Sequence, residues 1–304
     1  MTNKLHSMPG PVAHILCVLT SLVLTILLIC TGVMFPLTAV LTQRELNLHV
    51  AQAPAVLDAQ YARIGEKVDA LAAKYPFEPK TAMDLISRQQ VANYSAQVID
   101  WRLGLLKPDA EPAFPRFTQK GLLEAIQADE TFRAQTPEDQ RVSVSRDRIA
   151  AGVEKIVTET VAPLRMSLLS LVLNKLLPRL EASGMLPLLP WAPWILSAFC
   201  LALAGLMLLF THKRMVKGVL YTGSACMAAG LCLGAWMGAL AWLDLPARLS
   251  AYSSMAALQV HTLLNTLALP CLLGVLALLL LGAALVGVHQ HRMTRLRTTL
   301  TEAA

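Results

Sequence analysis

One histidine stands out among the residues that could take part in chemistry. His261 precedes the last of four long apolar segments, with Asn265 four residues after it and Ser254 seven residues before it. These spacings place the three side chains on one face of a helix. A neutral imidazole near a hydroxyl can act as the general base of an acyl transfer. The simpler interpretation is a histidine that forms hydrogen bonds at a membrane boundary.

Other signatures of catalysis are missing from the sequence. It contains no P-loop, no GxSxG nucleophile motif, no HExxH zinc motif and no glycine-rich dinucleotide fingerprint. The six cysteines lie in or beside the apolar segments, and no pair has the spacing of a zinc site. His289 and His291 are two residues apart and therefore point away from each other on a helix. We expect no metal site and no cofactor.

The apolar segments predict four membrane-spanning helices. About 20 apolar residues of helix cross a hydrocarbon core about 30 Å thick. Each segment reaches that length and contains no Asp, Glu, Lys or Arg. A hydrophobic content of 55% and a mean hydropathy of +0.52 are typical of membrane proteins. The expected spans are Val12–Phe35, which Pro36 follows near the expected outer boundary, Trp191–Phe210, Val219–Leu243 and Leu267–Val288.

The flanking charges predict the orientation of these spans. The formal net charge is +6, whereas residues 43–185 carry equal numbers of basic and acidic side chains. The excess lies beside the apolar segments, and short loops rich in Lys and Arg stay in the cytoplasm. We therefore expect a multi-pass protein of the plasma or inner membrane, with both termini cytoplasmic and residues 43–185 outside. The basic residues expected inside are Lys4, Lys213, Arg214, Lys217, Arg292, Arg295 and Arg297.

A cleaved signal peptide is the alternative interpretation of the first span. The apolar stretch of a signal peptide has about 7–15 residues, and a positively charged region precedes it. Val12–Phe35 is much longer, and only one lysine, Lys4, precedes it. A retained anchor is the favoured interpretation.

Residues 43–185 are expected to form a helical domain without disulfides, because this segment contains no cysteine. Apolar residues recur at spacings of three and four, which predicts amphipathic helices. Thr81 with Asp84 is expected to form a capping box, and Thr118 is expected to cap a short helix that ends near Gln135. The predicted stripes are Leu57, Tyr61, Ile64, Val68 and Leu71, and then Val91, Tyr94, Val98 and Trp101.

The predicted fold class is therefore all-α. It is a four-span helical membrane bundle with a helical extracytoplasmic domain inserted between spans 1 and 2. The predicted division is residues 1–42 for the N-terminus and first span, 43–185 for the outside domain, and 186–304 for spans 2 to 4 with the basic loop and tail.

Leu164–Leu180 is unusually rich in leucine for a domain outside the membrane. A helix that is apolar nearly all round is buried or touches lipid. Two interpretations remain open, a central helix of the bundle and a helix at the membrane surface. The residues expected to face lipid or the core are Leu169, Leu173 and Leu176.

Small residues recur at every fourth position of the third span, at Gly230, Gly234 and Gly238. Such a ridge lets two helices approach closely. The ridge is expected to pack within the four spans, and the alternative is a homo-oligomer formed through it.

The order of the elements resembles the lipoprotein intramolecular transacylases and related uncharacterised four-span bacterial membrane proteins. The shared layout is one span, an outside helical domain, three spans and a histidine in the outer loop before the last span. At residue level the resemblance covers Val260-His261-Thr262. It implies the movement of an acyl chain within a lipoprotein amino terminus, with His261 as the outward-facing catalytic histidine.

Two functions are consistent with these patterns, and whether the protein is an enzyme stays open. In the first, the outside domain binds a protein partner or membrane lipid, or scaffolds an assembly. Its balanced charge does not indicate nucleic-acid binding. The alternative is a membrane-boundary acyltransferase or lipid-modifying enzyme centred on His261.

Overall fold

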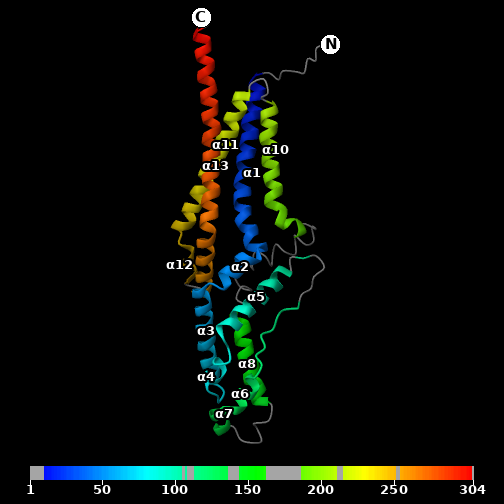
Figure 1. Ribbon diagram of the computed structural model, residues 1–304, viewed down its shortest axis with the longest axis vertical. Helices are drawn as coiled ribbons and strands as arrows, with labels where there is room; N and C mark the ends of the chain where they lie inside the picture. The colour runs from blue at the N-terminus through cyan, green and yellow to red at the C-terminus, as the bar shows by residue number, and fades with distance from the viewer. Residues whose placement is uncertain are drawn as a thin grey trace. The chain divides into compact units, whose positions relative to one another are not determined.

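The computed structural model describes residues 10–104, 107, 113–135, 144–161, 186–210, 215–250 and 254–302. In these ranges the regular elements are all helices, and no strand occurs (Figure 1). The chain forms two compact units. We call Met1–Ala39, Leu188–Asp244 and Leu264–Ala304 the membrane unit, and Val40–Pro187 with Leu245–Leu263 the helical domain.

Four helices are long and apolar enough to cross a membrane. They are α1 (Gly10–Thr42), α10 (Ala192–Phe210), α11 (Met215–Trp242) and α13 (Ser254–Glu302). The corresponding apolar stretches are His14–Thr42, Leu188–Met207, Lys217–Ser250 and Ala257–Arg295. In the most apolar stretch of each helix, only 11–22% is buried inside the protein. Apolar surface on this scale needs lipid around it, so the structure agrees with a membrane protein.

The first and last of these helices run further than the sequence predicts. Pro36 lies inside α1 instead of beyond its end, although a proline lacks the N–H that would bond to the carbonyl of Gly32. Helices in a membrane tolerate such a break. The expected outer loop before the last span is also mostly helical. It contains the short helix α12 (Leu245–Ser250), and α13 begins at Ser254. Asp244, in the left-handed conformation (φ 43°), separates α11 from α12.

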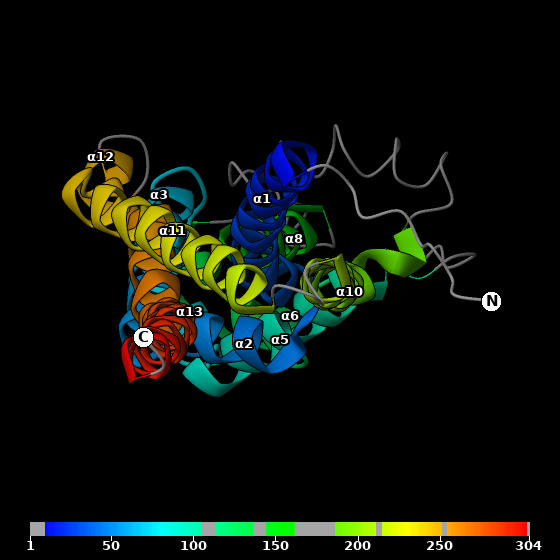
Figure 2. The same cartoon turned by 90° about the horizontal axis from the view of Figure 1, so that it is seen from above.

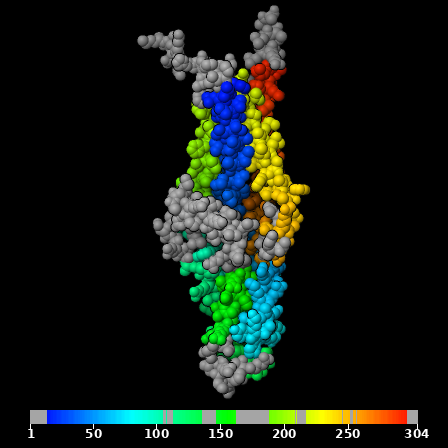
Figure 3. Space-filling view, turned by 180° about the vertical axis from the view of Figure 1, so that it is seen from behind, coloured from blue at the N-terminus to red at the C-terminus, as the bar shows by residue number. Residues whose placement is uncertain are grey.

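Helix α11 packs against the other three helices of the membrane unit (Figure 2). Figure 3 shows it beside α1. On one side its Leu233 covers Gly32 of α1, and its backbone carbonyl at Tyr221 accepts a hydrogen bond of 3.1 Å from Ser21. Helices α1 and α10 meet α11 in a small apolar core built from Leu24, Leu203, Cys200, Met207 and Ala225. Dispersion contacts of this kind hold helices together in lipid.

Among the glycines of α11 and α13, the tightest contact joins Gly223 and Gly282. A Cβ placed on Gly282 would lie 2.8 Å from the carbonyl oxygen of Gly223 and 2.5 Å from Met227 Cγ. A Cβ built on Gly230 of α11 would lie 2.9 Å from the side chain of Leu279 of α13. A Cβ built on Gly234 would make only an ordinary contact with Val275, at 3.5 Å.

The small-residue surface of α11 therefore packs within the protein at Gly230. No described atom lies within 4 Å of a Cβ built on Gly238. The tightest of these glycine contacts lies about two turns before the predicted ridge, at Gly223. That residue lies seven positions before Gly230 and so on the same helix face.

The two ends of the membrane unit differ in side-chain chemistry. The starts of α1 and α11 and the ends of α10 and α13 lie at one end (Figure 1). Lys217 near the start of α11 and Arg292 and Arg295 near the end of α13 are basic residues at this end. The tryptophans at the opposite helix ends, Trp191, Trp194 and Trp242, are exposed.

The described helices of the helical domain are α2 (Arg44–Ala51), α3 (Pro54–Ala72), α4 (Pro79–Met83), α5 (Arg88–Gly104), α6 (Leu122–Ala128), α7 (Glu130–Gln135), α8 (Val144–Val161) and α12. Helices α3 to α8 surround one apolar core, while α2 packs on α5 and α12 belongs to the same unit. Helix α8 packs on α3, α5 and α6. Among the fully buried residues are Ile64, Val68, Val91, Ile149 and Val153.

The predicted stripes are found in α3 and α5, with one shift. On α3 the most deeply buried residues are Val56, Gln60, Ile64 and Val68, while Leu57, Tyr61 and Leu71 are half-buried. The helix is therefore rotated toward Gln60, a polar residue that the pattern of apolar spacings passes over.

Both predicted capping positions in this domain are wrong. Helix α4 begins at Pro79, and the hydroxyl of Thr81 donates to Asp129 Oδ2 (2.6 Å) instead of capping. Helix α6 begins after Gly121, whose φ of +82° suits a glycine. Thr118 lies in the preceding segment. In both cases a tertiary contact or a glycine turn replaces the local cap.

Asp129 is the polar residue on which several of these elements converge. Its Oδ1 accepts the N–H of Phe132 at the start of α7, and its Oδ2 accepts the N–H of Glu78 beside α4. Burial raises the pKa of this carboxyl, but the hydrogen bonds that it accepts lower the pKa by more. The pKa lies below the usual value, so the carboxylate stays charged as these bonds require.

We predict that Gly282→Leu destabilises the membrane unit, because the new side chain meets backbone as well as Met227. Overpacking of this kind costs about 1–3 kcal/mol. Gly287→Leu on the same helix is the matched control, since no described atom lies within 4 Å of its Cβ position. Thermal melting of the detergent-solubilised protein measures both. Equal melting temperatures for the two variants would show that α11 and α13 do not meet at this glycine pair.

Candidate functional site

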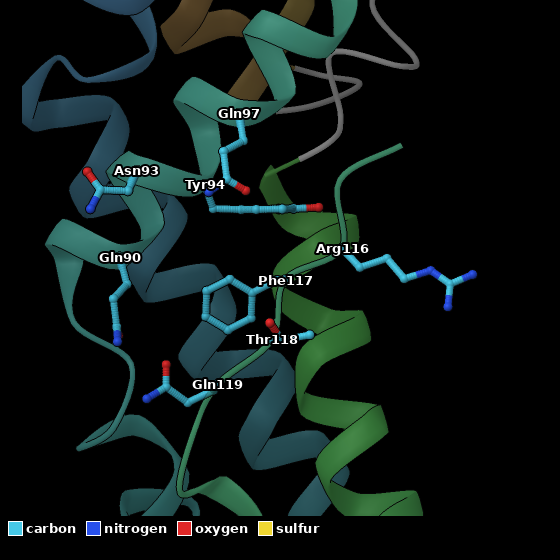
Figure 4. A pocket seen from close by; sticks show the side chains of 8 residues that line it. All are labelled: Gln90, Asn93, Tyr94, Gln97, Arg116, Phe117, Thr118 and Gln119. Atoms are coloured by element: carbon cyan, nitrogen blue, oxygen red, sulfur yellow. The ribbon is translucent and has the colours of Figure 1, made fainter. Parts of the chain in front are cut away.

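A small polar groove opens on the surface of the helical domain between α5 and the segment of residues 113–119. Its volume is about 180 Å³. The lining residues are Gln90, Asn93, Tyr94 and Gln97 from α5, and Arg116, Phe117, Thr118 and Gln119 from the segment (Figure 4). Amide side chains are the most common lining group. We call this site the amide groove.

Helix α5 positions three of these amides on one face. A capping box starts the helix, because Ser87 Oγ accepts the N–H of Gln90 and Gln90 Oε1 accepts the N–H of Ser87. From there Gln90, Asn93 and Gln97 follow at spacings of three and four, which align them along the helix. Val91 and Val98 lie on the buried side and hold the helix on the core.

The second wall has no helix, and its aromatic side chains attach it to the core. Phe114 packs edge-on against Trp101 with ring centroids 4.8 Å apart, and Phe117 packs edge-on against Tyr94 at 5.5 Å. Exposed Arg116, buried Phe117 and exposed Thr118 alternate as they do in extended chain. Both walls of the amide groove are therefore fixed by packing beneath them.

Hydrogen bonds from behind support the same wall. The hydroxyl of Tyr94 donates to the carbonyl of Pro115 at 2.9 Å. The N–H of Gln119 donates to Glu154 Oε1 of α8 at 3.0 Å. Burial raises the pKa of Tyr94, so the hydroxyl remains protonated and able to donate.

Much of the hydrogen-bonding capacity of the amide groove is uncommitted. Gln90 uses only its Oε1 in the capping box, and Asn93 uses only its Oδ1, which accepts from Gln89. Gln119 uses only its Nε2, which donates to the carbonyl of Lys120. Within the described part of the chain, the side chains of Gln97 and Thr118 form no hydrogen bond. The groove thus offers amide donors and acceptors to a ligand.

The groove carries little charge and no open aromatic face. Figure 4 shows Arg116 pointing away from the amides. Tyr94 and Phe117 form its floor, but they are only 3% and 6% exposed. A sugar ring needs an aromatic platform, and a phosphate needs cations, so this lining favours a neutral ligand that is rich in amide groups.

The carboxyl end of α5 forms a polar clamp on the junction between α1 and α2. Arg102 Nη2 donates to Asn47 Oδ1 at 2.5 Å and to the carbonyl of Val40 at 3.3 Å. Asn47 Nδ2 donates to the carbonyls of Val40 (2.9 Å) and Gln43 (2.7 Å). Burial lowers the pKa of Arg102, so the guanidinium depends on these acceptors. The clamp satisfies backbone carbonyls where the chain passes from α1 into α2.

A second pair supports the clamp at the surface. Arg44 donates two hydrogen bonds to Asp100, of 2.6 and 3.0 Å, and this pairing lowers the pKa of Asp100. Both side chains are about half exposed, so the pair contributes little to stability and mainly fixes geometry. Helix α5 therefore carries the amide groove at one end and the clamp at the other.

The histidine that the sequence singled out lies elsewhere. His261, Asn265 and Ser254 all lie on α13, and all three are exposed. Their spacing keeps them along one helix face, and none of them lines the amide groove. An acyl transfer centred on His261 stays a prediction.

The remaining predicted features are placed as follows. Leu164–Leu180, with Leu169, Leu173 and Leu176, lies outside the described residues, as do Lys4, Lys213 and Arg214. In the described ranges no group of three or more His, Cys, Asp or Glu side chains could hold a metal ion.

The amide groove is the feature that the sequence analysis missed. The amides at positions 90, 93 and 97 were visible in the sequence, but polar residues opposite an apolar stripe are usually only solvated.

Comparison with protein-family models, with curated proteins and with solved structures gives no match for this chain.

We predict that Asn47→Leu destabilises the helical domain more than Arg102→Met does. The first change leaves a half-buried guanidinium without its nearest acceptor, which costs about 2–3 kcal/mol, whereas the second removes the charge with its bonds at about 1–2 kcal/mol. The double variant should recover part of the loss, since the orphaned charge is gone. Thermal unfolding followed by circular dichroism measures the cycle, with exposed Arg63→Met as the control. Strictly additive losses would show that Asn47 and Arg102 act independently.

Proposed function

We propose that this protein is a four-span membrane protein whose helical domain, displayed outside the membrane, binds a partner through the amide groove. The observation that carries the proposal is the set of uncommitted amide groups on two walls that are held rigid from below. Surface amides with no ligand gain nothing from such a fixed arrangement. Preorganised donors and acceptors, in contrast, reduce the entropy cost of binding.

The lining and the size of the groove support a binding module rather than a closed active site. No titratable side chain except Arg116 and Tyr94 lines it, and neither is placed to act as a general base. A volume of about 180 Å³ is also smaller than the roughly 300–1,000 Å³ typical of pockets that enclose a whole small molecule. The occupant would therefore be part of a larger molecule that lies across the surface.

The proposed orientation rests on the two chemically different ends of the membrane unit. The basic residues at one end favour the cytoplasm, and tryptophans favour a membrane interface. Both termini would then be cytoplasmic and the helical domain would lie outside. The domain could also contact membrane lipid or scaffold an assembly. A second copy of the chain, bound through the surface around Gly238, is a further candidate partner.

We predict that single cysteines report this topology in a cysteine-free background. Ser143→Cys should react with a membrane-impermeant thiol reagent in intact cells, because residue 143 would be outside. Thr298→Cys should react only after the cells are permeabilised. Labelling of the second variant in intact cells would reverse the proposed orientation.

Photocrosslinking tests the binding function directly. We predict that a photoreactive amino acid at Gln97 produces a discrete crosslinked species in membranes of cells that express the protein. The matched control is the same amino acid at Arg63, which is exposed on α3 and does not line the groove. A shift on a gel identifies a protein partner, and a small mass increase identifies lipid. The same pattern at both positions, or no crosslink at either, would rule out binding at the groove.

A further inference from the structure

The backbone of the segment at residues 116–118 adds a second set of binding groups to the amide groove. Within the described part of the chain, the N–H and C=O groups of Arg116 and Thr118 form no hydrogen bond. In extended chain the backbone groups of alternate residues face the same edge. Arg116 and Thr118 therefore present one edge with two donors and two acceptors, close to the amides of α5.

We propose that the amide groove binds an extended, uncharged peptide segment of a partner protein, which it reads mainly through the peptide backbone. This inference rests on the proposed function and names the chemistry of the partner. The edge at residues 116–118 would pair with the peptide as in strand addition. The amides of Asn93 and Gln97 would bond to its other backbone groups, because a carboxamide offers the same donor and acceptor as a peptide bond.

The lining decides between this ligand and the alternatives. A helical peptide has its backbone groups already paired, so it could not use the free edge. An oligosaccharide would lack an aromatic face to stack on, since Tyr94 and Phe117 are buried in the floor. An anionic ligand would find only Arg116, which points away in Figure 4. The small volume also fits one or two small side chains of a peptide that continues beyond the groove.

The test uses the full-length protein in phospholipid nanodiscs. A phage-displayed library of random peptides provides the probe, and fluorescence anisotropy of a labelled, selected peptide measures affinity. We expect uncharged sequences that favour extended chain. Gln97→Leu should weaken binding about fivefold, the value for one net hydrogen bond, and Asn93→Leu/Gln97→Leu should weaken it further. Gln127→Leu, an exposed glutamine of α6 outside the groove, should leave the affinity unchanged.

A second measurement leaves the protein untouched. N-methylation along the selected peptide removes one backbone donor at a time, and the loss of affinity should recur at every second position. Losses without this alternation, selected peptides that bind Gln97→Leu equally well, or preferential binding of a chitin oligosaccharide would overturn the proposal. Crosslinking at Gln97 together with a negative peptide result would discard the peptide while leaving a groove that binds another partner. Failure of both experiments would discard the proposed function as well.

Discussion

Apolar packing is the constraint on which the helical domain depends. Its sequence contains no cysteine that could cross-link it, and its described part contains no cluster of metal ligands. The ion pairs described in it are largely exposed, with side chains such as those of Arg88 and Asp58 more than half accessible. Stability must therefore come from the core that α3, α5 and α8 enclose, at about 25 cal/mol for each Å² of apolar surface removed from water.

This constraint explains where polar chemistry can be placed. One face of helix α5 is buried in the core through Val91, Tyr94 and Val98, so its opposite face can carry amides. The same core anchors the neighbouring segment through Phe114 and Phe117. The amide groove thus depends on the packing in the layer beneath it, and a loss of packing at Phe117 would remove one wall of the site.

The sequence predicts the helical class and the four apolar helices because hydrophobic length and periodicity are local properties. Prediction from the sequence fails where contacts with residues distant in the chain determine the local structure. Thr81 has the spacing of a capping residue, but its hydroxyl donates a hydrogen bond to Asp129 instead. The close contact of α11 with α13 involves Gly282, which no spacing rule on α11 identifies. The amide groove depends on two segments that only the fold brings together, so neither segment reveals the site alone.

The make-up of the helical domain has a consequence for biogenesis. This compact unit contains Leu245–Leu263 as well as Val40–Pro187, and two long apolar helices, α10 and α11, separate the two parts in the chain. A ribosome adds roughly 5–20 residues each second, so the first part waits several seconds for the second. During that interval the nascent domain is incomplete and open to chaperones. A fragment that stops at residue 187 would lack Leu245–Leu263 permanently and would therefore remain incomplete.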